Sequence, residues 1–366
     1  MGTNRLFILG MACIFAVLSA VSLYAQKPQV NPAEEVFGKN FKLTVDPTSG
    51  TLKSITSEKT NTLESIEAKK DVHVISDKLE LFCDELYYDA KTQKYNASGK
   101  RVKIVEGTLT AFCGKFTYDH NLGLSEFLIN PEIIIKDEQG RKTITKGNRI
   151  KIERQKNGDT LVQVEGNATL TSEKGSGGTP KIGQAVAPAQ KMFGREFKII
   201  TGEKGEILYV FSDKNELKSI VAREEVYINS EQVDLRCGRL EYFSDKNKLL
   251  AMGKPVKILE KTLVAEAGRF EYYPDDGKSY LMEDPVIKNS DVKGRNMETR
   301  GDKITIVQSK EGRTIILVEG GAEGAPSIQS AEMSSVKKSE PAREQTPLPV
   351  DESNVDQIKN AEIRQD

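Results

Sequence analysis

The sequence predicts an all-β protein assembled from two copies of one strand-rich unit. Two observations carry this prediction. Apolar and polar residues alternate with a period of two, in segments bounded by turn-forming residues. The whole pattern recurs after about 154 residues, which is a repeat of domain size. Beyond the first 25 residues, no segment holds a helical period for more than two turns.

Composition narrows the range of functions. The 366 residues carry 53 basic and 54 acidic side chains, for a net charge of −1. Nucleic-acid-binding proteins usually show a basic excess, so we expect no nucleic-acid partner. The chain has only two histidines. A metal or catalytic site based on histidine would need His73 and His120, which lie in different segments.

The N-terminus resembles a secretory signal. Arg5 precedes an uncharged run over residues 6–25, and the polar residues Gln26 and Lys27 follow it. We predict a signal helix over residues 1–25, cleaved after Ala25, that exports the remaining chain. A run of about 20 residues is also long enough to span a bilayer, so an uncleaved inner-membrane anchor is the alternative.

Self-comparison divides the exported chain into two units. Residues 81–119 align without a gap over residues 235–273. Over the full repeat, roughly a third of the paired positions are identical. The identical pairs include Cys83 with Cys237, Gly99 with Gly253, Phe116 with Phe270, and Pro131 with Pro285. We therefore predict two homologous units, over residues 37–171 and 193–324.

Composition describes the segments outside the units. Residues 172–192 are rich in Gly, Pro, Ala and Ser and have no apolar period, so we predict a flexible linker. Residues 325–366 are rich in Ser, Glu, Gln, Lys and Pro, with few large apolar side chains. Such a segment cannot bury enough apolar surface to offset the entropy lost on ordering, so we predict a disordered tail.

A repeated phase slip predicts that the strands bend. The apolar positions run through Leu109, Ala111 and Cys113, and then shift by one residue to Phe116 and Tyr118. The same slip recurs at Cys83-Asp84, Cys237-Gly238 and Ala267-Gly268. A slip of one residue reverses the buried face unless the strand bulges or bends. Bends at matching places would fold a meander into two facing sheets around a long interior, either open along one side or filled as in an ordinary sandwich.

The repeated motif resembles the OstA-like repeat of lipopolysaccharide-transport proteins, the family of LptA and LptC. It occurs as LTAFCGKFTYDHNLG (109–123), as LYYDAKTQKYNASGKRVKI (86–104) and as LEYFSDKNKLLAMGKPVKI (240–258). The resemblance covers both units. It implies two tandem antiparallel β-jellyrolls, or β-tacos, in the periplasm. It also implies a hydrophobic cleft for the acyl chains of lipid A, and end strands that pair with other transport proteins.

The apolar positions of the alternating strands predict which residues line the cleft. We predict that four positions in the first unit and their four equivalents in the second point into the interior. They are Val102, Ile104, Leu109 and Phe116, and Val256, Ile258, Leu263 and Phe270. With the family resemblance, these residues become a predicted lipid-binding cleft. The neighbouring Lys100, Arg101 and Lys103, with Lys254 and Lys257, are interpreted as a charged solvent face, with a phosphate-contacting rim as the alternative.

The sequence indicates no catalytic residue, metal site or cofactor. Its carboxylates fall at turns and on the polar phase of strands, as on solvated faces. Cys83 and Cys113 occupy equivalent repeat positions and are predicted to be buried thiols rather than a disulfide. Two alternatives to lipid transport stay open. One is a closed scaffold that acts through edge-strand contacts without lipid, and the other, weaker, is a polysaccharide-active enzyme.

Overall fold

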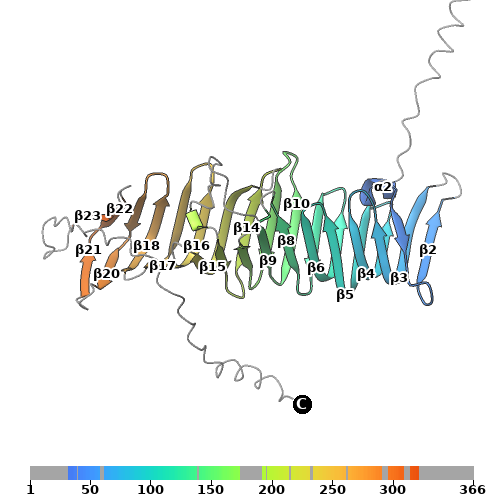
Figure 1. The fold of residues 1–366 in the computed structure, drawn as a ribbon, viewed down its shortest axis with the longest axis horizontal. Coiled ribbons are helices and arrows are strands. Elements are labelled where there is room, and N and C mark those ends of the chain that lie inside the picture. The colour runs from blue at the N-terminus through green and yellow to red at the C-terminus, as the bar shows by residue number, and fades with distance from the viewer. Residues whose placement is uncertain are drawn as a thin grey trace, which may run out of the picture.

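The computed structural model is an elongated stack of antiparallel strands (Figure 1). It describes residues 32–38, 40–57, 62–137, 140–173, 192–194, 196–213, 216–230, 234–260, 263–290, 296–308 and 314–320. The predicted signal helix, most of the predicted linker and the predicted tail lie outside these residues. Within them, no helix is long and apolar enough to cross a membrane.

Eight long strands of the described residues run through both walls of the stack. Each of them therefore takes part in two sets of strand pairings. They are β3 (Leu63–Ile75), β4 (Glu80–Asp89), β5 (Lys94–Glu106), β6 (Leu109–Asp119), β15 (Leu217–Ser230), β16 (Asp234–Phe243), β17 (Lys248–Glu260) and β18 (Leu263–Tyr273). One end of each long strand pairs within a first wall and the other end within a second wall. We call the line along which these strands cross between the walls the ridge.

Short strands complete each wall. The β2 wall contains β2 (Thr51–Thr56), β7 (Leu124–Leu128), β10 (Arg149–Arg154), β11 (Thr160–Glu165), β14 (Glu206–Phe211), β19 (Lys278–Met282), β22 (Lys303–Gln308) and β23 (Thr314–Glu319). The β1 wall contains β1 (Lys42–Thr44), β8 (Glu132–Lys136), β9 (Lys142–Lys146), β12 (Thr169–Glu173), β13 (Phe197–Ile200), β20 (Val286–Ser290) and β21 (Asn296–Arg300). The side opposite the ridge, where the turns 76–79, 107–108, 120–123 and 155–159 lie, is called the mouth.

The predicted bends in the long strands are confirmed. The pairing of β4 with β5 shifts register between Phe82 and Glu85, and the pairing of β16 with β17 shifts at the equivalent place. Glycine is needed where two bends meet, because a Cβ at Gly253 would lie 2.7 Å from the backbone nitrogen of Gly238. At the phase slips that follow Cys113 and Ala267, Gly114 N donates to Ile129 O and Gly268 N donates to Glu283 O, at 2.9 and 2.8 Å.

The two halves of the stack follow the same strand plan. We call residues 32–173 the first half and residues 192–320 the second half. Strands β4 to β11 recur as β16 to β23, each displaced by the spacing found in the sequence. The ridge repeats as well, since the positive φ angles of Lys70 (67°) and Asp71 (47°) recur at Glu224 (65°) and Glu225 (53°).

The halves are joined edge to edge. Strand β11 pairs with β14 and β12 pairs with β13, so 23 strands form one hydrogen-bonded sheet in the part of the chain that the structure describes. We call these two pairings the seam. The interior therefore runs through both halves without a dividing layer, and the buried apolar residues form one cluster. The seam is also tied across the walls, because the hydroxyls of Thr145 and Tyr209 lie 2.6 Å apart in the core.

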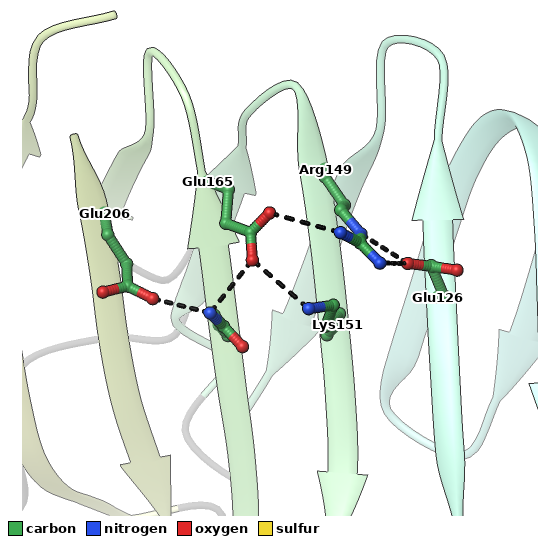
Figure 2. Close-up of polar contacts among 6 residues, drawn as sticks. Glu126, Arg149, Lys151, Glu165 and Glu206 are labelled. Carbon is green, nitrogen blue, oxygen red and sulfur yellow. Dashed lines mark hydrogen bonds and ion pairs between the residues drawn. The ribbon is translucent and has the colours of Figure 1, made fainter. Parts of the chain in front are cut away.

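A polar ladder crosses the outer face of the β2 wall at the seam (Figure 2). Arg149 pairs with Glu126 on one side and lies 3.6 Å from Glu165 on the other. The Glu165 carboxylate also accepts from Lys151 at 3.3 Å and from Gln163 at 3.0 Å. Gln163 then donates to Glu206 at 2.6 Å. The ladder thus links strands of both halves.

A short helix, α2 (Pro32–Phe37), precedes the first strand and was not predicted. It starts before the predicted boundary at residue 37 and belongs to the first half, because Ala33, Val36 and Phe37 are buried. The Phe37 ring packs against Tyr88 and Tyr95, at centroid distances of 5.2 and 5.1 Å. In the second half, buried Phe193 packs against Tyr242 in the same way, at 5.5 Å.

Candidate functional site

A cavity of about 320 Å³ lies between the walls, lined by the first half and by Phe211 of β14 in the second half. Its lining comes from both walls and from α2, which contributes Val36. The apolar part of the lining includes Tyr95, Phe116, Phe127 and Ile152 from the β2 wall and Ile104 and Ile135 from the β1 wall. The cavity reaches the mouth, because turn residues such as Thr108 and Gly123 also line it. The interior is therefore not completely filled here.

The predicted cleft residues of the first half converge on this cavity, with one exception. Ile104, Leu109 and Phe116 line it. Val102 is fully buried but belongs to the core near the ridge rather than to the lining. The second-half equivalents are all in the apolar core, with Val256, Ile258 and Phe270 buried and Leu263 partly buried. Their role in binding lipid stays a prediction.

Aromatic rings pack against one another in the cavity wall. Tyr95 packs against Phe116 at 5.5 Å and against Tyr118 at 5.4 Å, and Phe116 packs against Phe127 at 4.8 Å between ring centroids. Tilted rings at these distances attract one another beyond the area they bury. Burial raises the pKa of Tyr95 and Tyr118, so both hydroxyls stay neutral at ordinary pH. An uncharged, ring-lined wall suits alkyl chains.

The mouth of the cavity carries charge. Arg154, the last residue of β10, forms an ion pair with Glu106, the last residue of β5. These residues belong to opposite walls, so the pair spans the mouth. Lys78 and His120 also line the cavity at this side. None of these four residues was predicted as part of the site. Comparing the repeats would have singled out Arg154 and His120, because the second half has Gln308 and Pro274 there.

The predicted basic face of β5 lies elsewhere. The guanidinium of Arg101 stacks 4.1 Å from the centroid of Phe112, and the Lys103 ammonium lies 5.0 Å from that of Phe82. Phe112 alternates with the buried Ala111 and Cys113, so both contacts are on the outer face of the β1 wall. For Arg101 and Lys103, the interpretation as a solvent face agrees with this placement, and the phosphate-rim alternative does not.

The buried cysteines and His73 have structural roles. Cys83, Cys113 and Cys237 are buried free thiols, and burial raises the pKa of each to about 12. His73 stacks on Phe82 at 4.2 Å and lies 3.1 Å from Glu80, on the outer face. Within the described ranges, no group of three or more His, Cys, Asp or Glu side chains is arranged to hold a metal ion.

Among the comparisons with known proteins, only the one with solved structures gives a match. No family model and no curated protein matches the chain. Among solved structures it is similar to LptH, the LptA-homologous periplasmic component of the lipopolysaccharide transport device of Pseudomonas aeruginosa. The identity is 10%, and the match covers 58% of this chain and 94% of that chain. The TM-score of 0.20 is low, so this likeness carries no inference about ligand or partner.

Proposed function

We propose that this chain is a periplasmic lipid-binding protein of lipopolysaccharide transport, which holds acyl chains between its two walls. The observation that carries the proposal is the ring-lined cavity of about 320 Å³ that reaches the mouth. Each methylene that leaves water for such a cavity contributes about 0.8 kcal/mol. The choice of lipopolysaccharide rests on the OstA-like motif in the sequence.

The volume of the cavity limits how many acyl chains it can hold. Pockets for small molecules usually measure about 300–1,000 Å³, so this one is at the small end. It suits one acyl chain rather than all the chains of a lipid A molecule. The sugar and phosphate groups of such a lipid would stay in water beyond the mouth, where charged residues lie.

The ends of the stack support a bridging role. The outermost strands β2 and β23 expose apolar side chains, with Leu52 at 52% and Leu317 at 47% of full exposure. Exposed strand edges pair readily with other strands. The seam shows how such a pairing would look, since β23 is the repeat equivalent of β11 and β2 has the place of β14. We propose that β23 of one chain accepts β2 of a second copy, or the matching edge of another transport protein.

This end-to-end contact would be weaker than the seam. The inward face of β14 is Ile207, Tyr209 and Phe211, all buried. The corresponding face of β2 is Leu52, Ser54 and Thr56. Since β2 offers less apolar area, its pairing depends more on backbone hydrogen bonds and would be reversible.

Site-specific photocrosslinking in cells tests the lipid. A photoreactive residue at Phe116 is expected to capture lipopolysaccharide, and one at Phe112, on the outer face of the same strand, is the matched control. Leu109→Asp is expected to abolish capture, because a charge on the cavity lining would have to lose its water when an alkyl chain enters. Leu109→Ala should lower stability through the larger cavity and keep some capture. No lipid at Phe116 in the wild-type chain would favour the dry scaffold instead.

A disulfide trap tests the bridge. The seam pairs Leu161 with Val210, which corresponds to Ile315 facing Ile55 of the next copy. Cysteines at Ile315 and Ile55 are therefore expected to link two chains on mild oxidation, since directly paired residues lie within disulfide reach. Cysteines at Ile316 and Ile55 point to opposite faces and are the control. Equal linkage in both pairs would show random contact rather than this register.

A further inference from the structure

The ion pair at the mouth joins the walls at an exposed position. The Arg154 side chain is 67% exposed and that of Glu106 is 40% exposed. Arg154 is held in place by its backbone, whose N–H donates to Gly123 O at 3.2 Å. A pair this open to water is weak, because solvent screens both charges. A competing anion can therefore replace Glu106 as the partner of Arg154 without disturbing the fold.

Two other side chains at the mouth can contact such an anion. Lys78 adds a second cation to the lining, and His120 adds an imidazole. Arginine is well suited to the task, since its planar fork binds phosphate or carboxylate oxygens in pairs. Leu109 and Tyr95 belong to the apolar part of the same lining. Charge at the opening and rings behind it match an amphiphile with an anionic head.

The repeat supplies an internal comparison. The apolar lining residues Ile104, Leu109 and Phe116 recur in the second half as Ile258, Leu263 and Phe270, and Glu106 recurs as Glu260. The cationic or imidazole residues do not recur. Arg154, His120 and Lys78 are replaced by Gln308, Pro274 and Gln232. The duplicated plan thus keeps the apolar lining positions in both halves, while Arg154, His120 and Lys78 are particular to the first half.

We propose that the mouth of the first half is an anion-recognition site for the head group of a lipid whose alkyl chain enters the cavity. Arg154 binds a phosphate or carboxylate, with Lys78 and His120 beside it. Glu106 is the counter-ion that the head group displaces. This inference rests on the proposed function and adds to it that the first half selects anionic over neutral amphiphiles.

Calorimetric titration of the exported chain with three probes tests the proposal. The probes are dodecyl phosphate, dodecyl maltoside and inorganic phosphate, with both amphiphiles below their critical micelle concentrations. Dodecyl phosphate is expected to bind at least tenfold more tightly than dodecyl maltoside, and inorganic phosphate far more weakly than either. Arg154→Gln, which introduces the residue of the second half, should weaken dodecyl phosphate binding about tenfold and leave dodecyl maltoside unchanged. Glu106→Gln should strengthen dodecyl phosphate binding severalfold.

Arg300→Gln is the matched control. Arg300 is 65% exposed and paired with Glu298, but it lies on β21, away from the cavity. Its loss should change no affinity. Equal binding of the two amphiphiles, unaffected by Arg154→Gln, would overturn the anion site and leave the lipid-binding function standing. Binding of neither amphiphile would remove the proposed function itself. Inorganic phosphate binding as tightly as dodecyl phosphate would assign the site to a free anion and overturn its role with a lipid.

Discussion

The two halves of the stack share their strand plan and differ in what lies between the walls. In the first half the interior is lined by rings, where Tyr95 and Phe127 face a cavity. The second half has Leu249 and Leu281 at the equivalent positions, and both are buried. The alternation of apolar and polar residues is sufficient to define the walls. The anion site that we propose depends on the smaller set of residues at which the copies differ.

The largest expected difference concerns the aromatic residue that precedes the first strand of each half. Phe37 packs against three rings, those of Phe41, Tyr88 and Tyr95, and Phe193 against two, those of Phe197 and Tyr242. Removal of a buried phenylalanine costs about 3–5 kcal/mol. We expect Phe37→Ala to lie at the upper end of that range and Phe193→Ala at the lower end, in urea unfolding followed by circular dichroism. A larger loss for Phe193→Ala would show that ring contacts do not set the difference.

The buried thiols allow a second comparison of the two halves, through the pH dependence of the free energy of unfolding. Their pKa in the folded chain is about 12, against 9.0 when exposed. The unfolded chain therefore releases these protons first, and stability that is fully present below pH 9 falls as the pH rises toward 12. At pH 10 the loss is about 1.4 kcal/mol for each thiol.

The first half holds two of these thiols and the second half one. The variant Cys83→Ala/Cys113→Ala should lose about 3 kcal/mol less than the wild type between pH 8 and pH 10. Cys237→Ala should lose about 1.4 kcal/mol less. Buried tyrosines titrate in the same window but contribute equally to all three proteins. Identical pH dependence in all three proteins would mean that the thiols are not buried in solution.

The sequence predicted the walls better than the mouth. Period-two alternation and its slip at Cys113-Gly114 predicted the bends and placed Ile104, Leu109 and Phe116 beside the cavity, because both are local properties of a strand. Helix α2 was missed, since six residues are too few to show a helical period. The Glu106–Arg154 pair was missed because its members are 48 positions apart and meet only when the walls face each other.

The smallest expected effect concerns the outer face, where the halves have equivalent cations in different settings. Arg149 pairs with Glu126 and lies near Glu165, within the ladder of Figure 2. Its equivalent Lys303 lies 5.3 Å from the centroid of Tyr280 and 3.2 Å from Glu319.

Both cations are more than a third exposed, so solvent screening keeps their contributions small. We expect Arg149→Gln to lower the unfolding free energy by about 1 kcal/mol, because it breaks two contacts in a connected ladder. Lys303→Gln should cost less than about 0.5 kcal/mol. A double-mutant cycle of Arg149→Gln with Glu126→Gln measures the coupling directly. A coupling near zero, with equal losses for the two cations, would mean that the ladder adds nothing to the backbone pairing of the seam.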